Sequence, residues 1–431
     1  MSRSSSGRTW RAEFARWLRP FLAALRREAQ RRWAPVYLEG LLGPGERKSV
    51  APMAARVAPD DVEQLHHFVA TSPWASEPLE QVLAQTAQRL VGGPAAVLII
   101  DDTALPKQGR HSVGVARQYC GALGKTANCQ TLVSLTLAQG EVPLPLALRL
   151  YLPEEWTQDP ARRRRVGVPP ELPFRPKGQI ALAELDRVRA AGVTFGTVLA
   201  DAGYGTSAEF RQALSARGLC WAVGVLARQQ VYPADVSVAS RALPRSTAQA
   251  MLAARGPRAW RRLTWRRGTK GPLRAHFAAV QVREAVRKQG RYQPGAAAWL
   301  VGERRVSGEV KYYLTNHPPG TPVRTLARAI KARWICEQAH QQMKEELGLD
   351  HYEGRSWSGL HHHALLSLIA FAFLQHWRLT QTPGGKKTAP RGERPTSAPH
   401  LAGGTARPLR GHPRCARPMS ALPCPSRAIA A

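Results

Sequence analysis

Aspartates that follow apolar runs are the residues of this sequence best suited to chemistry on phosphate esters. Asp101 and Asp102 follow a continuous apolar run at residues 95–100, and Asp201 follows another at residues 195–200. Such runs are typical of strands that are buried on both faces. Because neighbouring parallel strands bring their carboxyl ends to one crevice, we expect these carboxylates to lie close together.

A further acid comes from a helix predicted over residues 325–347. On that helix Glu337 shares one face with Arg333 and Lys344, because offsets of four and eleven residues return to nearly the same direction. A cluster of carboxylates suits Mg²⁺, a hard cation that prefers oxygen ligands and retains water and phosphate oxygens. Two such ions about 3.5–4 Å apart would stabilise the attacking and the leaving oxygen of a displacement at phosphorus.

Each of these residues also has an ordinary structural explanation. An aspartate at a strand end is often a turn or cap residue, and Glu337 beside Arg333 is often only an ion pair between successive helix turns. Lys344 is then a solvated surface residue. The combination, in this order along the chain, favours a catalytic site over the separate explanations.

The composition points to a polyanionic partner. Lys and Arg number 62 against 30 Asp and Glu, a net charge of +32, which favours double-stranded DNA over a charge that serves solubility alone. The six cysteines include no CxxC pair and complete no zinc spacing, which is typical of a reducing cytoplasm. The longest apolar stretch, residues 364–374, is shorter than the roughly 20 residues of a membrane span, so it predicts a buried core helix and no membrane association.

Changes of texture along the chain predict an α/β protein with five parts. These are a basic helical region, a core in two parts, a β-rich insertion between them, and a disordered basic tail. Their limits are residues 1–92, 93–226 with 320–380, 227–319, and 381–431. The helical region either recognises DNA ends or covers the core, and the residues leave both readings open.

Three motifs resemble the DDE transposases of bacterial insertion sequences, in the group with a Tyr-x2-Arg-x3-Glu-x6-Lys signature. Arg333-x3-Glu337-x6-Lys344 keeps that spacing, although Ile330 stands where the signature has Tyr, which removes any role of a tyrosine hydroxyl there. Residues 199–205 (Leu-Ala-Asp-Ala-Gly-Tyr-Gly) are similar to the second-acid motif, and residues 110–120 resemble one branch of the group. The resemblance covers about residues 30–378.

Asp101-Asp102-Thr103 is similar to the first-acid motif of this group, in which the acid directly before Thr is the ligand. The resemblance therefore gives that role to Asp102, with Asp101 as the alternative. It implies that Asp102, Asp201 and Glu337 are the catalytic metal ligands.

The resemblance implies an RNase H-like fold that the β-rich insertion interrupts. It implies Mg²⁺-dependent cleavage at the element's ends and strand transfer into target DNA, with two ions and with Mn²⁺ as a substitute. Arg333 and Lys344 would bind phosphates of the DNA. The protein would act as a dimer on DNA in the bacterial cytoplasm, at the nucleoid. The alternatives are a DNA-binding protein that has lost catalysis and an RNase H-like nuclease without strand transfer.

Other candidates have weaker support. Trp260 and Trp265 are candidates for stacking on an unpaired base, although such residues are more often core or strand-pair aromatics. Arg162–Arg165 is expected to be an exposed cluster in a Pro-rich loop, available to backbone phosphates. His361–His363 cannot easily share one metal ion on a helix, so we expect surface or cap histidines there.

Overall fold

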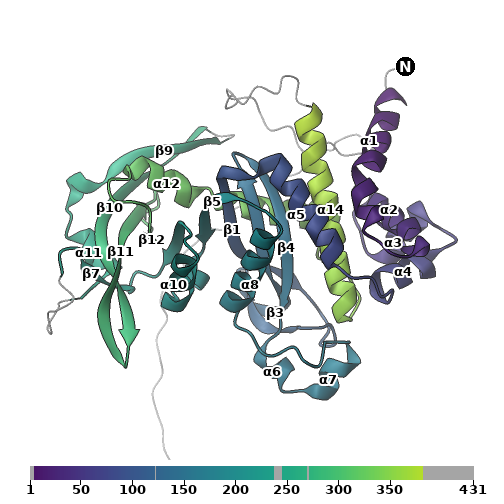
Figure 1. Ribbon diagram of the computed structural model, residues 1–431, viewed down its shortest axis with the longest axis horizontal. Coiled ribbons are helices and arrows are strands. Elements are labelled where there is room, and N and C mark those ends of the chain that lie inside the picture. The colour runs from purple at the N-terminus through teal and green to yellow at the C-terminus, as the bar shows by residue number, and fades with distance from the viewer. Residues whose placement is uncertain (1–3, 122, 237–244, 269–270, 382–431) are drawn as a thin grey trace, which may run out of the picture. The chain divides into compact units, whose positions relative to one another are not determined.

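The computed structural model describes residues 4–121, 123–236, 245–268 and 271–381 (Figure 1). As expected, the chain begins with a helical region that precedes the sheet. Its helices are α1 (Ser4–Ala23), α2 (Glu28–Leu42), α3 (Val50–Val57), α4 (Val62–Ala70) and α5 (Glu77–Val91). The tail expected over residues 381–431 lies, from residue 382 onward, outside the described residues. The limits proposed for the other parts stay a prediction.

The core is a mixed sheet in which five strands follow the order β4-β3-β1-β5-β6. Strand β3 runs antiparallel to its neighbours β4 and β1, whereas β5 runs parallel to β1 and β6 runs parallel to β5. This is the RNase H-like arrangement that the motifs predict. The strands are β1 (Gly93–Pro106), β3 (Lys125–Gln139), β4 (Val142–Tyr151), β5 (Phe195–Ala200) and β6 (Trp221–Val225).

One expectation about β1 is wrong: Asp101 and Asp102 lie inside the strand and not at its end. The strand continues because β3 supplies antiparallel partners as far as Pro106, beyond the point where β5 stops. Successive side chains of a strand point to opposite faces, so the two aspartates diverge. Asp201, in contrast, directly follows the last residue of β5, as predicted.

The β-rich insertion extends the core sheet. Strand β12 pairs with β6, and β11, β10 and β7 follow in turn, so that a single sheet of 12 strands is formed among the described residues. Edge strand β2 (Ala116–Cys120) pairs with β3 on the other side. The insertion strands are β7 (Gln230–Pro233), β8 (Ser246–Thr247), β9 (Arg261–Gly268), β10 (Gly271–Lys288), β11 (Arg291–Arg304) and β12 (Val310–Thr315).

The helix predicted over residues 325–347 is in fact two helices, α12 (Val323–Lys331) and α13 (Trp334–Leu347), with Arg333 at the N-cap of the second. The break has a packing cause, because α12 packs on β9 and β10 of the insertion and on β5 and β6 of the core, whereas α13 packs on β1 and β4. The remaining helices are α6 (Glu154–Thr157), α7 (Pro160–Arg165), α8 (Lys177–Ala190), α9 (Ala202–Gly205), α10 (Ala208–Ala216), α11 (Ala248–Ala253), α14 (Trp357–Gln381) and the 3₁₀ helix η1 (Pro257–Ala259).

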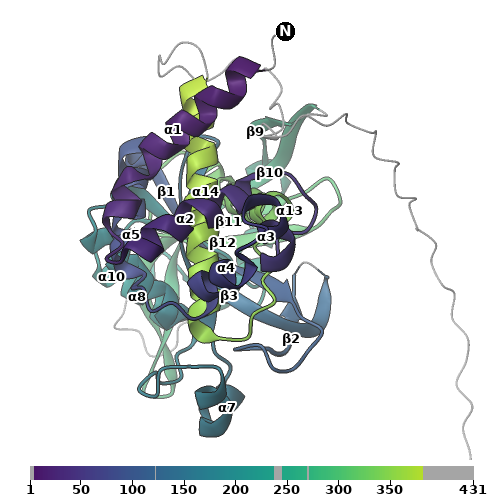
Figure 2. The ribbon, with the colours of Figure 1, turned by 90° about the vertical axis from the view of Figure 1, so that its right-hand side faces the viewer.

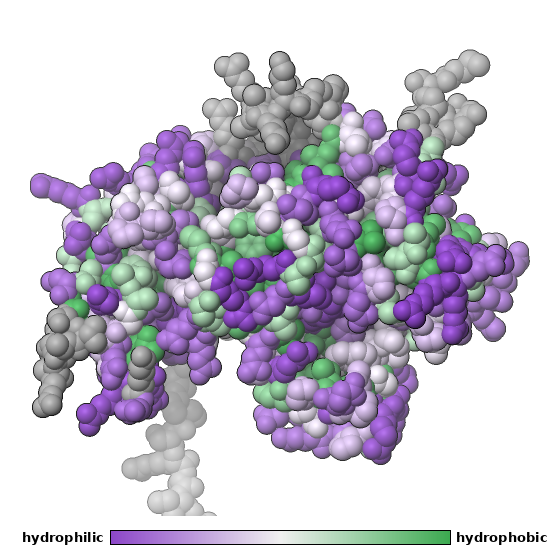
Figure 3. Space-filling model, viewed as in Figure 1, coloured by the Kyte–Doolittle hydropathy of each residue, from purple (hydrophilic) through white to green (hydrophobic). Residues whose placement is uncertain are grey.

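Helix α14 comes from the C-terminal part of the chain but lies among the helices of the N-terminal region, with α1, α2, α4 and α5 packed against it (Figure 2). It is long and apolar enough to cross a membrane by length and composition, but 78% of its most apolar window is buried inside the protein. It is therefore the core helix that the apolar stretch predicts. On the face shown in Figure 3, hydrophilic residues cover most of the surface and hydrophobic ones lie in smaller areas between them.

The histidines of α14 are not the surface or cap residues that we expected. His362 and His363 are buried, and His361 is partly buried. Each ring nitrogen of the three lies within hydrogen-bonding distance of a backbone atom or of the Tyr37 hydroxyl. The helix passes through the centre of the region, so residues on every side of it face other helices or the sheet.

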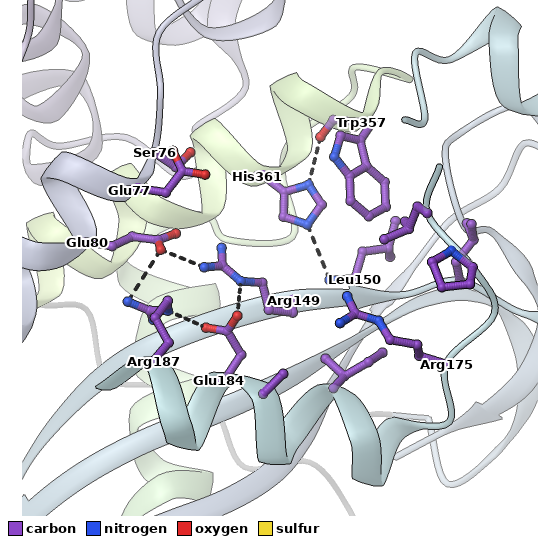
Figure 4. Close-up of a pocket in the computed structure, with 15 residues that line it drawn as sticks. Ser76, Glu77, Glu80, Arg149, Leu150, Arg175, Glu184, Arg187, Trp357 and His361 are labelled. Carbon is purple, nitrogen blue, oxygen red and sulfur yellow. Dashed lines mark hydrogen bonds and ion pairs between the residues drawn. The ribbon is translucent and has the colours of Figure 1, made fainter. Parts of the chain in front are cut away.

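An ion-pair network joins the helical region to the sheet (Figure 4). Arg149 of β4 donates to Glu80 of α5 at 2.6 Å and to Glu184 of α8 at 2.7 Å, and Arg187 of α8 pairs with both acids. Glu80 is only 3% exposed. The network lines a pocket of about 370 Å³ in which these four charged groups already satisfy one another.

Candidate active site

The predicted acids gather around one pocket of about 740 Å³. It lies where β1, β5 and α13 meet, with edge strand β2 at one side and the start of α8 at another. The residues that line it are Asp101, Asp102, Thr103, Ala104, Gln118, Tyr119, Gly121, Thr131, Lys177, Asp201, Glu337, His340, Gln341, Lys344, Glu345 and Asp350. The structure thus brings together the candidate residues of all three motifs except Arg333, which contacts two of the acids.

Asp101 is the most buried of the acids. It lies on the sheet face that carries Ile99 and Leu199 and that α13 covers, and its carboxylate pairs with Arg333. Burial raises the pKa of Asp101 to about 7, with Arg333 opposing that rise and Asp201 adding to it. Asp101 is therefore a carboxyl group whose charge depends on the cation beside it.

Asp102 points to the other face of β1, and two side chains hold it. Lys177, at the first turn of α8, donates to Oδ2 at 2.6 Å, and the hydroxyl of Tyr204 donates to Oδ1. Burial raises the pKa of Tyr204 well above its ordinary value, and the nearby Asp102 carboxylate adds to the rise. The phenol therefore keeps its proton and remains a donor to Asp102.

Asp201 is fixed by the turn that follows β5. Its Oδ1 accepts the backbone N–H of Gly203 at 2.9 Å and that of Tyr204 at 3.3 Å, so it caps the short helix α9. Gly205 allows this turn to approach β6, because a Cβ at that position would lie 2.1 Å from the carbonyl oxygen of Gly224. The Asp-Ala-Gly-Tyr-Gly motif therefore combines an acid, a donor to Asp102 and a close backbone contact.

Glu337 and Arg333 lie at the start of α13. The guanidinium of Arg333 contacts both Asp101 and Glu337. Burial lowers the pKa of Arg333, but the charges of Asp101, Glu337 and Asp201 outweigh that effect, so the pKa is raised. Lys344, three turns along the helix, donates to the carbonyl oxygen of Ala104 at 2.8 Å, and burial lowers its pKa. The solvated surface position considered for Lys344 is thus not the one it occupies.

Arg333 contacts Asp101 and Glu337 directly, and Asp201 is a further acid that raises its pKa. Across the described ranges, no three His, Cys, Asp or Glu side chains converge closely enough to hold a metal ion. Cations lie between the carboxylates instead. The donor set nevertheless fits a hard divalent cation, because it offers only carboxylate oxygens at a pocket large enough for water and phosphate oxygens.

Lys177 lies in no motif that would mark it, because its role depends on its side chain reaching Asp102 of β1 from the N-terminus of α8. Tyr204 belongs to a recognised motif, but its contact with Asp102 could not be seen there. Trp260 and Trp265, the two candidates for stacking on a base, lie outside the pocket. The guanidinium of Arg304 lies 4.1 Å from the ring centroid of Trp260, and the ammonium of Lys331 lies 4.4 Å from that of Trp265.

The arginine cluster at residues 162–165 forms most of helix α7, not a loop. Arg162 lies 3.6 Å over the ring of Trp156, and Arg163 donates to three backbone carbonyls, so both are structural. Arg164 and Arg165 are exposed, as predicted for the whole cluster.

Two family models match this chain. Residues 20–272 match the family described as DDE superfamily endonuclease, and residues 178–373 match the transposase DDE domain. The protein named "Probable transposase for insertion sequence element IS701" from Microchaete diplosiphon is 32% identical over 168 residues, which are 39% of this chain and 41% of that protein. The match therefore spans about two fifths of that relative's length.

Among solved structures, a piggyBac transposase synaptic complex with hairpin DNA is 10% identical with a TM-score of 0.40, over 84% of this chain and 71% of that one. The first family model matches more than half of the chain. The chain belongs to the DDE superfamily endonucleases.

Proposed function

We propose that the protein is a transposase, which cleaves phosphodiester bonds at the ends of an insertion sequence and joins the freed 3′ ends to target DNA. Membership of the family implies dependence on a divalent metal ion. In this proposal the ion is Mg²⁺, two ions are bound, and Mn²⁺ substitutes for them. The observation that carries the proposal is the pocket in which the acids of three separate motifs meet beside Arg333 and Lys344.

Asp201 and Glu337 are two of the metal ligands, and the first ligand is either of two neighbours. The sequence motif favours Asp102. The structure favours Asp101, because this residue lies on the sheet face that α13 covers and contacts the same arginine as Glu337. We therefore propose Asp101 as the first ligand in place of Asp102, with Asp102 as a positioning residue that Lys177 and Tyr204 hold.

A bound divalent ion supplies positive charge to the attacking and leaving oxygens of the displaced phosphate. With such an ion bound, the cations of the chain become available to the DNA. Arg333 has the planar, bidentate donor geometry that fits a phosphate once its two carboxylates have another positive partner. Lys344 reaches the same pocket from the next turns of α13 and offers a further donor to the DNA backbone.

The test is cleavage and joining of a plasmid that carries the element's ends, with Mg²⁺. Glu337→Gln and Asp101→Asn are expected to abolish cleavage while binding of the ends persists, and Asp102→Asn to slow it. Glu209→Gln is the matched control, since this exposed acid on α10 lies outside the pocket. Complete loss with Asp102→Asn and full activity with Asp101→Asn would return the first ligand to Asp102.

The same assay separates the alternatives. Cleavage without joined products would identify a nuclease without strand transfer, and binding without cleavage by the wild type would identify a non-catalytic DNA-binding protein. Action as a dimer would appear as a complex that holds two ends at once. A cytoplasmic protein at the bacterial nucleoid follows from the same proposal, since the substrate is chromosomal DNA.

A further inference from the structure

A row of basic side chains crosses three strands of the insertion, outside the pocket just described. Arg262 of β9 lies directly opposite His276 of β10, and His276 lies directly opposite Arg304 of β11. Arg274 is two residues before His276 on β10 and therefore faces the same side. All four are exposed. We name them the cationic row: Arg262, Arg274, His276 and Arg304.

The row faces away from the hydrophobic support of the insertion. Residues Ala275 and Phe277, which alternate with the row along β10, pack against Leu326 and Ile330 of α12. Helix α12 therefore covers one face of this part of the sheet (Figure 1), and the row occupies the opposite one. None of the four residues lines the pocket of the carboxylates.

Within the part of the chain that the structure describes, the row has no acidic partner. Among the described residues, no carboxylate forms an ion pair with the three arginines of the row, whereas Arg266, on the same strand as Arg262, pairs with Glu141. The contacts that the row does make are neutral: Arg274 Nε donates to Thr264 Oγ1 at 3.2 Å, and the guanidinium of Arg304 lies over Trp260.

Strands are about 4.7–4.9 Å apart, so the Cα atoms of Arg262 and Arg304 are about 10 Å apart, on either side of an imidazole. A polyanion with charges at short, regular intervals can pair with each guanidinium.

We propose that the cationic row binds the phosphate backbone of double-stranded DNA, at a place separate from the site of cleavage. The proposal rests on the proposed function for the identity of the polyanion. The row is open and exposed, and guanidinium groups bind phosphates with paired hydrogen bonds. Contacts of this kind position a duplex and carry no sequence information.

The test is the salt dependence of binding to a duplex of arbitrary sequence, measured by fluorescence anisotropy. Each phosphate contact contributes about 0.9 to the slope of log K against log [salt]. The double variant Arg262→Gln/Arg304→Gln is expected to lower that slope by about 1.8, and to weaken binding about 60-fold at 0.1 M salt.

Two controls make the result specific. Arg262→Lys/Arg304→Lys keeps both charges and is expected to retain the slope, which separates phosphate contact from any loss of folding. Arg189→Gln/Arg228→Gln removes the same charge from two exposed positions elsewhere, one on α8 and one between β6 and β7, and is expected to leave the slope unchanged. An unchanged slope in the row variant, or an equal loss in this second control, would overturn the proposal.

Failure of this proposal is distinguishable from failure of the proposed function. The binding measurement needs neither cleavage nor element ends, and the exposed control Glu209→Gln, outside the pocket, is expected to bind with the wild-type slope. If the row variants bind normally while Glu337→Gln abolishes cleavage, the row is wrong and the transposase proposal stands. If the slope falls but the wild type never cleaves, the row stands as a DNA contact and the catalytic proposal fails.

Discussion

Protonation of His363 is expected to destabilise the protein as the pH falls from 7 to 5. The imidazole is 0% exposed, and its two nitrogens have fixed roles. Nε2 lies 3.2 Å from the carbonyl oxygen of Gly348 and so must donate, which leaves Nδ1 to accept the hydroxyl of Tyr37 at 2.8 Å. The neutral ring is thus fully bonded, and burial lowers the pKa of His363 to about 4.

The direction and size of the effect follow from linkage. The pKa in the folded protein lies below the ordinary value near 6.5, so between about pH 6.5 and pH 4 the unfolded chain binds more protons. The contribution of His363 to stability is therefore present above pH 6.5 and is lost as the pH falls toward 4. With these two pKa values, about 2 kcal/mol of the free energy of unfolding is lost between pH 7 and pH 5.

The assay is urea unfolding of the wild type and of His363→Gln at pH 7 and pH 5. Glutamine keeps a donor and an acceptor but does not titrate, so the variant is expected to lose about 2 kcal/mol less than the wild type over this interval. His66→Gln, at an exposed position of α4, is the control and is expected to follow the wild type. Equal losses in the wild type and His363→Gln would show that this histidine is not held neutral by burial, and the reasoning would be refuted.

Two further changes test the packing that supports the pocket. Arg149→Met removes one of the two cations that pair with Glu80 of α5 and Glu184 of α8. It is expected to lower the free energy of unfolding by about 3 kcal/mol, measured by urea unfolding, and an unchanged value would mean that Arg187 alone suffices. Gly205→Ala places a Cβ 2.1 Å from the carbonyl oxygen of Gly224, so we expect a lower melting temperature by calorimetry and displacement of Asp201, and wild-type melting would contradict the contact.

Much of the core could be predicted from local pattern. The apolar runs before Asp101 and Asp201 are strands, because such runs are typical of strands buried on both faces of a sheet. The single helix predicted over residues 325–347 was wrong, because periodicity continues through Arg333 while the two halves pack on different strands. The histidines of α14 were misplaced because a polar residue type says little about burial when partners come from distant helices.

By itself the sequence determined the chemical inventory of this protein: which acids and cations exist, in which motifs, and on which kinds of element. Those properties depend on residue type and short spacing, which are local. Only the tertiary structure decided that Asp101 faces α13 and pairs with Arg333 while Asp102 faces Lys177 and Tyr204. The physical reason is the pairing of β1 with β3 beyond the end of β5, which fixes the pleat and so sends adjacent side chains to opposite faces.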